Sequence, residues 1–335
     1  MRVLSLPGRH PYVAHLAAVG GDAVLRVDGE PEAGEPDGGD VRAGEWSDLG
    51  DVDLVHVHVG LTTCSALALS ALTDQVRPLG LPLVVTVHDL PHPGHPDPDR
   101  VARVLDVLMP VADDVVTLTV AAARLVLAGW GRTSHVLPHP HVLDASALGA
   151  PLRPVGPPVV GLAAASAGEE VGAMVDVALA VVGEVPGARL RLDLPWTGAV
   201  EPAGLARRWA GLALVGGLDL RRHEHQVSDP AVYLRQVDVC VLHRQDSSLA
   251  TWLEACFDAG VPVVAPEHGL YCDRPWAQTY DPARPLTLAS ALRTALRSTS
   301  SRQAHREERL AERELIALAH AELYGALLDR QRRGG

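Results

Sequence analysis

The sequence predicts an α/β protein with two doubly wound parallel sheets, and three observations support this fold class. Short apolar runs of strand length alternate with longer helix-type segments through both halves of the chain, which is typical of parallel sheets covered by helices. A segment rich in Pro, Gly and Ala at residues 143–158 separates the two alternating series. The chain has 335 residues, which is enough for two domains that each bury a core.

In the first half, strands are expected at apolar runs bounded by turn residues. The runs are "MRVLSLP" (1–7), "VDLVHVHVG" (52–60), "LPLVVTVHDL" (81–90) and "DVVTLT" (114–119), and "SHVLPHPHV" (134–142) closes this half. Helices are expected within 8–21, at 62–80 ending at Gly80, at 100–113, and at 120–131 with Gly131 near its end. Residues 28–46 hold Gly, Pro and acids with almost no large apolar side chain, so they predict a solvated loop.

The second half repeats the alternation without any sequence repeat that relates it to the first. Strands are expected at 159–165, 188–194, 212–218 ("LALVGGL"), 237–243 and 261–266, and helices at 169–184, 203–211, 229–236 and 249–259. Residues 301–335 predict one long amphipathic helix whose apolar positions are Leu310, Leu315, Ala319, Leu323 and Leu327. We expect this helix to pack on a domain rather than to form a coiled-coil dimer.

Composition excludes several classes of protein. The net charge of −12 argues against a nucleic-acid partner, because phosphate binding needs a basic face. No run of eighteen apolar residues occurs, so no transmembrane segment is expected. The start "MRVLSLPGRH" lacks the long apolar region of a signal peptide. Four cysteines without paired spacing indicate structural thiols and a cytoplasmic protein.

Several polar residues follow the expected strands directly. His88 and Asp89 follow one of them, His139 and His141 follow another, and His243 and Arg244 follow a third. In open α/β sheets ligands bind beyond the carboxyl ends of the strands. His88 is therefore a candidate for a substrate contact or a proton donor and acceptor, and its alternative role is a capped histidine bonded to a neighbouring loop.

Other motifs are weak or absent. His56 and His58 share one face of their strand, and with "HPH" (139–141) and "HEH" (223–225) they could form a metal site. No H-E-x-x-H or Cys-x-x-Cys supports a metal, and we expect none. The chain also lacks G-x-G-x-x-G after its first strand, a P-loop and a G-x-S-x-G elbow. These absences disfavour a dinucleotide oxidoreductase, a P-loop protein and a hydrolase.

The stretch "DSSLATWLEACFDAGVPVVAPEHG" (246–269) places an acid, Glu254, in an otherwise apolar helix eight positions after Asp246. A buried carboxylate costs several kcal/mol unless it is paired. Either a basic group inside the protein or a ligand must therefore satisfy Glu254. We expect that no basic side chain fully occupies it, and pairing with a nearby Arg is the structural alternative. For Asp246 the alternative role is the N-cap of its helix.

In this stretch an acid is followed, after seven residues, by the Glu of "EACFDAGVPVVAPEHG". This spacing resembles the donor-site signature of retaining family 4 glycosyltransferases. Together "VHDL", "WLEAC" and "VLPHPHV" resemble a compact actinobacterial-type subgroup of that family. The resemblance extends over nearly the whole chain. It implies the GT-B fold, in which two Rossmann-like domains face a cleft, here an acceptor-side domain at 1–141, a linker at 142–158 and a nucleotide-sugar domain at 159–308. The final helix, at 309–331, would pack back on the first domain.

The same resemblance implies an enzyme, a glycosyltransferase of hexosyltransferase type. It would move a sugar from a nucleotide diphosphate to a hydroxyl of a small molecule or glycan, without a further cofactor. Glu254 would bind the ribose, because a carboxylate accepts two bonds from a diol, and Asp246 would hold sugar hydroxyls. His88 would approach the sugar. The remaining implied residues are Ser247, Ser248, Gly269 and Leu270 at the nucleotide sugar, and His10, Tyr12 and His58 on the acceptor side.

One departure from the family pattern concerns the phosphate site. Family members place a basic pair after the first strand of the second domain, whereas this chain has "VVGLAAASAGEEVGAM" with two acids and no cation. Arg244 would then be the cation that neutralises the donor diphosphate. Two alternatives stay open, namely a non-catalytic homologue that binds a ligand or partner protein, and a sugar-nucleotide epimerase.

Overall fold

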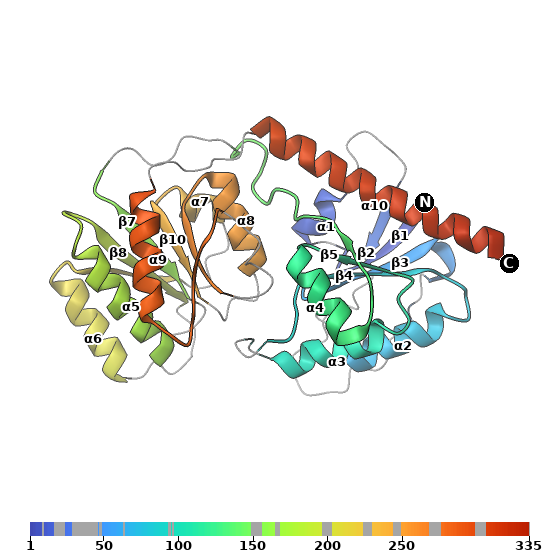
Figure 1. Cartoon of the computed structure of the whole chain (residues 1–335), viewed down its shortest axis with the longest axis horizontal. Helices are drawn as coiled ribbons and strands as arrows, with labels where there is room; N and C mark the ends of the chain where they lie inside the picture. Colours follow the sequence, from blue (N-terminus) through green and yellow to red (C-terminus); the bar gives the residue numbers. More distant parts are fainter. Residues whose placement is uncertain are drawn as a thin grey trace. The chain divides into compact units, whose positions relative to one another are not determined.

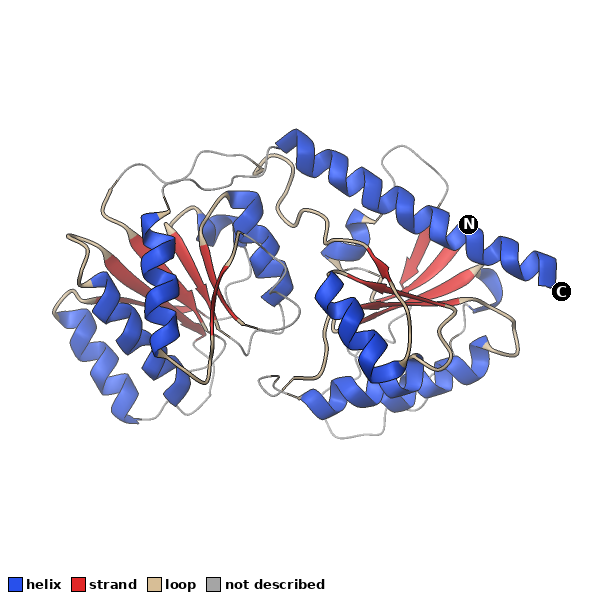
Figure 2. Ribbon diagram, in the orientation of Figure 1, coloured by secondary structure: helices blue, strands red, loops and turns tan. Residues whose placement is uncertain are grey.

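The structure is a computed structural model, which describes residues 1–8, 10–16, 24–28, 46, 49–62, 64–92, 95, 97–148, 156–164, 168–195, 203–223, 230–243, 249–267, 276–298 and 306–334. The chain divides into two compact units, Met1–Pro140 with Leu310–Gly335, and His141–Arg309. Each unit holds one six-stranded sheet, and the strand pairs are parallel. The two doubly wound parallel sheets expected from the sequence are confirmed (Figures 1 and 2).

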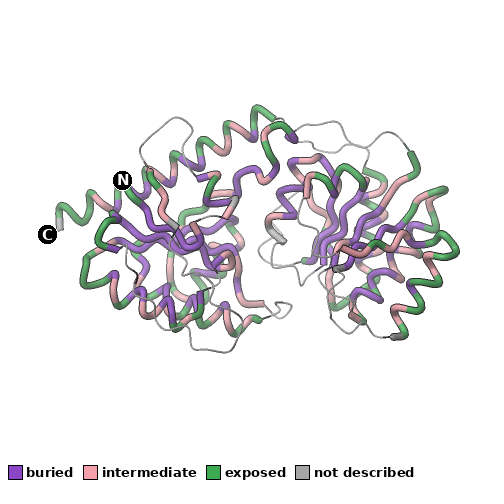
Figure 3. The backbone as a smooth tube through the Cα atoms, turned by 180° about the vertical axis from the view of Figure 1, so that it is seen from behind, coloured by how far each residue is buried: buried purple, intermediate pink, exposed green. Residues whose placement is uncertain are grey.

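The sheet of the first unit has the order β2-β1-β3-β4-β5-β6. Its strands are β1 (Arg2–Leu6), β2 (Leu25–Asp28), β3 (Leu54–Val59), β4 (Leu83–Val87), β5 (Asp114–Thr117) and β6 (His135–Val136). The elements around it are α1 (Pro11–His15), the 3-10 turn η1 (Leu49–Asp51), α2 (Ala66–Val76), α3 (Pro98–Leu108) and α4 (Val120–Trp130). Every residue of β3 and β4 is buried, as expected for central strands covered on both faces (Figure 3).

The helix α10 (Arg306–Gly334) begins in the second unit and continues in the first. Its buried residues Leu323, Tyr324 and Leu327 pack against one residue from each of four strands, Val3, Leu54, Val84 and Val116. Because side chains alternate along a strand, His56 and His58 lie on the same face of β3 as Leu54. The face of the sheet beneath α10 therefore carries both histidines.

The sheet of the second unit has the order β12-β11-β10-β7-β8-β9. Its strands are β7 (Val159–Ala163), β8 (Arg189–Pro195), β9 (Leu218–His223), β10 (Val239–Leu242), β11 (Val263–Pro266) and β12 (Gln278–Tyr280). Its helices are α5 (Glu169–Val182), α6 (Ala203–Leu214), α7 (Pro230–Leu234), α8 (Leu249–Ala259) and α9 (Leu286–Arg297). Apolar residues of α5, α6 and α9 pack with those of β7, β8 and β10 in one core.

Local sequence signals explain several helix ends. The Thr119 side chain accepts a hydrogen bond from the Ala122 amide at the start of α4. Gly131 ends this helix in the left-handed conformation, with φ of 66°, as its position in the sequence predicts. Helix α2 ends earlier than expected, at Val76, and Gly80 closes the following turn with φ of 64°. No helix in the described part of the chain has the length and apolar character needed to cross a membrane.

Two sequence predictions are wrong in the described residues. The strand predicted at 212–218 is not formed, because α6 continues to Leu214 and β9 begins only at Leu218. The apolar run that suggested a strand lies on the surface, where Leu214 and Val215 are 88% and 80% exposed. In α10, Leu315 is 66% exposed, whereas Ile316 is buried and takes the predicted place of Leu315 in the apolar stripe. Strands β2 and β12 and helix α9 were not anticipated, and most of the predicted loop at 28–46 lies outside the described residues.

Candidate functional site

The carboxyl ends of the strands at which a sheet reverses its order are the usual ligand sites of doubly wound folds. In the first unit the order reverses between β1 and β3. Tyr12 follows β1 in α1, His58 lies near the end of β3, and His88 comes directly after β4. The structure therefore brings these three predicted residues to one edge of the sheet.

These residues form a buried group of rings together with His139. The ring centroid of Tyr12 lies 4.4 Å from that of His88, 4.9 Å from that of His139 and 5.5 Å from that of His58. Nδ1 of His58 lies 3.2 Å from Nε2 of His88. None of the four residues is more than 7% exposed. We call Tyr12, His58, His88 and His139 the imidazole cluster.

Two predicted residues next to the imidazole cluster, His10 and Asp89, have different roles. Nδ1 of His10 accepts a hydrogen bond of 3.2 Å from the Tyr12 amide, so His10 caps the helix that carries Tyr12. Asp89 accepts hydrogen bonds from the Leu90 amide at 2.9 Å and from Nε2 of His95 at 2.6 Å. Of the two polar residues in "VHDL", His88 therefore joins the imidazole cluster and Asp89 binds its own loop.

A second buried polar group lies beside the imidazole cluster, under α10. The Tyr324 hydroxyl lies 2.6 Å from Nδ1 of His56 and accepts a 3.3 Å bond from Nη2 of Arg26. The Tyr324 hydroxyl can therefore donate to Nδ1 of His56 while it accepts from Arg26. Nε2 of His56 lies 2.7 Å from Thr86 Oγ1, so both ring nitrogens of His56 have a hydrogen-bond partner. The His56 ring lies 4.0 Å from that of His58.

The imidazoles in this region are held uncharged. Burial lowers the pKa of His56, His58 and His88 well below the ordinary value of 6.5, and neighbouring histidines lower it further. Burial also lowers the pKa of His320 to about 4 and raises the pKa of Tyr12. At neutral pH these groups act as hydrogen-bond partners and not as cations.

In the second unit the sheet reverses its order between β7 and β10. The buried His243 directly follows β10, and its Nε2 lies 3.6 Å from Oε2 of Glu170 in the first turn of α5. Residues 159–188, which include β7 and α5, contain no Lys or Arg. A histidine and an acid thus lie at the point where the family resemblance would imply a basic pair, in agreement with the departure noted in the sequence.

Glu254 lies in α8 and is 2% exposed, as its apolar sequence neighbours predict. Its Oε2 accepts a 3.2 Å bond from Nη2 of Arg309, whose Nε donates to Asp258 Oδ1 at 2.8 Å. Asp258 also accepts hydrogen bonds from the amides of Val142 and Leu143, at 2.6 and 3.2 Å. The ion pair given as the structural alternative for Glu254 therefore exists, and Arg309 shares its donors between two carboxylates.

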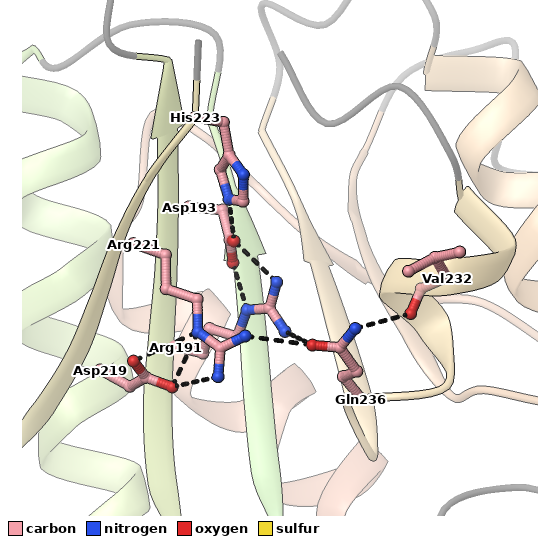
Figure 4. Close-up of polar contacts among 7 residues, drawn as sticks. All are labelled: Arg191, Asp193, Asp219, Arg221, His223, Val232 and Gln236. Atoms are coloured by element: carbon pink, nitrogen blue, oxygen red, sulfur yellow. Dashed lines mark hydrogen bonds and ion pairs between the residues drawn. The ribbon is translucent and has the colours of Figure 1, made fainter. Parts of the chain in front are cut away.

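Sequence reasoning missed a polar network on β8 and β9, in which Arg191 and Asp193 are buried (Figure 4). Asp193 accepts two hydrogen bonds from Arg191, at 2.6 and 2.8 Å, and one of 2.6 Å from Nε2 of His223. Arg191 and Arg221 both donate to Oε1 of Gln236. Arg191 and Asp193 alternate in "RLRLDL", and two opposite charges two residues apart on one face of a strand were the available signal.

Several predicted residues lie outside the described residues. They are Arg244, Asp246, Ser247, Ser248, Gly269 and Leu270, together with His225 and Cys272. Cys64, Cys240 and Cys256 are buried, and no disulfide joins them. In the described part of the chain, no group of three His, Cys, Asp or Glu residues is arranged to hold a metal ion.

No family model and no curated protein matches the sequence. Solved structures do match it. The sucrose-phosphate synthase of Thermosynechococcus elongatus is 17% identical, with a TM-score of 0.59 over 98% of this chain and 99% of that chain. HepE of Anabaena in complex with UDP and glucose is 14% identical, with a TM-score of 0.59 over 97% of this chain and 100% of that chain. A glycosyltransferase of Rickettsia africae is 12% identical, with a TM-score of 0.58 over 98% of each chain. The chain therefore has the GT-B fold of these glycosyltransferases.

Proposed function

We propose that the protein is a glycosyltransferase that moves a sugar from a nucleotide diphosphate to an acceptor hydroxyl, with retention of configuration as the family resemblance implies. The observation that carries the proposal is the GT-B fold shared over almost the full length of chains such as HepE, which was solved with UDP and glucose. A shared fold alone leaves the activity to the residues of the site. The proposal therefore depends on the roles of named residues in each unit.

We propose that the second unit binds the nucleotide sugar, with residues 159–308 as its domain and residues 142–158 as the linker. Glu254 would accept hydrogen bonds from the ribose hydroxyls in addition to its contact with Arg309. Asp246, Ser247 and Ser248 would hold the sugar, and the amides of Gly269 and Leu270 would meet the diphosphate. Because residues 159–188 supply no cation, Arg244 would provide the permanent positive charge that stabilises the leaving diphosphate.

We propose that the first unit, residues 1–141 with the helix at 309–331, supplies the acceptor side and one contact to the reacting sugar. His88 is the candidate for that contact, because it directly follows a central strand and is held neutral by burial. Tyr12 and His58 surround His88, and His10 caps the helix of Tyr12. The donor and a small-molecule or glycan acceptor would be the only small molecules that the reaction needs, without a cofactor.

One observation favours a second candidate function, a non-catalytic homologue that binds a ligand or a partner protein. Glu170 lies 3.6 Å from His243 at the point where the second sheet reverses its order. A carboxylate at that point repels a diphosphate, and the ion pair with Arg309 gives Glu254 a structural role. A protein with this arrangement could keep the fold without the reaction.

Thermal unfolding in the presence of nucleoside diphosphates tests the proposed function. A ligand that binds only the native state raises the midpoint of unfolding by mass action. We expect a diphosphate of one nucleobase to raise the midpoint more than the matching nucleoside, because the phosphates contribute binding energy. If no nucleoside diphosphate and no sugar nucleotide shifts the midpoint, the proposal of a nucleotide-sugar enzyme fails.

A further inference from the structure

The contact between His58 and His88 joins two ring nitrogens, and only one of them can carry the proton between them. Nδ1 of His58 lies 3.2 Å from Nε2 of His88, and both residues are buried. The proton is therefore either on His58 Nδ1 or on His88 Nε2. This choice decides which tautomer His88 has, and so whether its Nδ1 is a donor or an acceptor.

The other nitrogen of His58 distinguishes the two arrangements. Nε2 of His58 is buried and has no hydrogen-bond partner among the residues that the structure describes. If His88 donates, His58 must carry its own proton on this Nε2, which leaves a buried N–H without an acceptor. If His58 donates from Nδ1, its Nε2 is a bare lone pair. A buried N–H group without an acceptor is rare in protein interiors.

The rings around His58 offer no charge that would reverse this preference. The His56 ring lies 4.0 Å away in a tilted arrangement, and the Tyr12 ring approaches edge to face at 5.5 Å. Both ring nitrogens of His56 are already engaged, by Tyr324 and by Thr86. His58 is therefore free to choose the tautomer that avoids the buried N–H.

We propose that His58 is a positioning residue, which donates its Nδ1 proton to Nε2 of His88 and holds His88 as the Nδ1–H tautomer. His88 then offers a hydrogen-bond donor, and not a base, to an oxygen of its ligand. That His88 contacts the transferred sugar rests on the proposed function. The tautomer itself does not depend on the proposed function, so the two can fail separately.

Nitrogen NMR of the histidine rings in the full chain tests the tautomer directly, because the two ring nitrogens differ in shift when only one is protonated. His320 and His141 serve as internal standards, since Nδ1 of each faces a carbonyl oxygen and must carry the proton. We expect His58 and His88 both to show the Nδ1–H pattern. If His88 is mainly the Nε2–H tautomer, the proposal is wrong.

Two variants separate positioning from a merely structural role. Asn places an amide N–H near the position of His Nδ1, so His58→Asn should keep His88 as Nδ1–H. Leu offers neither a donor nor an acceptor, so in His58→Leu the bare Nε2 of His88 should lose its hydrogen bond, and its nitrogen shift should move to that of a free lone pair. An unchanged Nε2 shift of His88 in His58→Leu would overturn the proposal, whatever the activity of the protein.

Turnover of a sugar nucleotide provides the functional readout of the same pair. We expect His58→Leu to lower kcat by about tenfold or more, the scale of one misplaced transition-state contact, and His58→Asn to lower it less. Thermal midpoints are measured alongside, because a structural role would lower kcat only in proportion to the loss of folded protein. Equal kcat in two variants that differ in the hydrogen bond at Nε2 of His88 would remove the catalytic part of the inference.

Discussion

Arg309 meets two carboxylates of α8 that we assign to different tasks. Asp258 binds Arg309 and the amides of Val142 and Leu143, so its bonds are all internal to the second unit. Glu254 binds Arg309 through one oxygen and is the residue that we propose for the ribose. Glu254→Ala should weaken nucleotide binding by about 2–3 kcal/mol, because two charge-assisted bonds are lost. Isothermal titration with the stabilising nucleoside diphosphate measures this loss.

The matched control is Asp258→Asn on the same helix. It should lower the free energy of unfolding by about 3 kcal/mol, because a buried ion pair loses one partner, and it should leave the affinity of the folded protein for the nucleotide unchanged. Urea denaturation and the same titration measure the two quantities. If Glu254→Ala lowers stability but not affinity, Glu254 is a structural partner of Arg309 and the ribose role is wrong.

The sequence could identify Glu254 but not its partner. A carboxylate flanked by Leu253 and Ala255 in an apolar helix has to be buried, and it is. Arg309 is 55 positions away in a segment that reads as a solvated helix face, so no local pattern connects the two. The same limit applies to His58 and His88, which are 30 positions apart and meet only because β3 and β4 are neighbours.

At the scale of elements, α10 is attached to the first sheet by a polar anchor as well as by apolar packing. The hydroxyl of Tyr324 lies between His56 and Arg26, whereas Leu323 and Leu327 fill the core beside it. Tyr324→Phe should lower the free energy of unfolding by about 1–3 kcal/mol, because it leaves buried polar groups without a partner. Chemical denaturation measures the change.

Leu318 provides the control on the same helix, since it is 53% exposed. Leu318→Ala should change stability by no more than about 0.5 kcal/mol, as surface substitutions usually do. A Tyr324→Phe variant as stable as this control would mean that the hydroxyl does not anchor α10.

The sequence predicted helices and strands correctly where the apolar pattern was long or where the strand was central in its sheet. β3, β4 and β10 are continuous apolar runs that parallel sheets require. The strand predicted at 212–218 failed because periodicity does not distinguish a surface apolar run from a buried one. Gly216, with φ of 78°, ends that run in a turn, and the charged strand β9 that follows lacks an apolar signal.

At the scale of the whole molecule, the buried histidines make stability depend on pH. The folded-state pKa of His320 is about 4, below the ordinary 6.5, so the unfolded chain binds a proton first as the pH falls. The contribution of neutral His320 to the free energy of unfolding is therefore fully present above pH 6.5. It is lost as the pH falls from 6.5 to about 4. His56, His58 and His88 act in the same direction, and Asp89, whose pKa is raised, opposes them.

Urea denaturation across this range measures the effect. The contribution of His320 to the free energy of unfolding is about 3 kcal/mol, as the size of its pKa shift implies. His320→Leu should flatten the dependence by removing that contribution, because Leu does not titrate. The hydrogen bond from Nδ1 of His320 to the Ile316 carbonyl is lost in this variant, so the slope with pH and not the absolute stability is compared. An unchanged slope would contradict a neutral buried His320.

The central claim, transfer of a sugar from a nucleotide diphosphate, is tested most directly by the release of nucleoside diphosphate from a panel of sugar nucleotides. We expect the wild type to release the diphosphate of one nucleobase, and Arg244→Ala to do so about tenfold to a thousandfold more slowly, the scale of one lost transition-state contact. Arg330→Ala, which removes only a surface pair with Asp114, should match the wild type. Wild-type rates in Arg244→Ala would place the phosphate cation elsewhere. Binding of a sugar nucleotide without release from any donor, in the presence of a range of acceptors, would contradict the claim and identify a non-catalytic homologue.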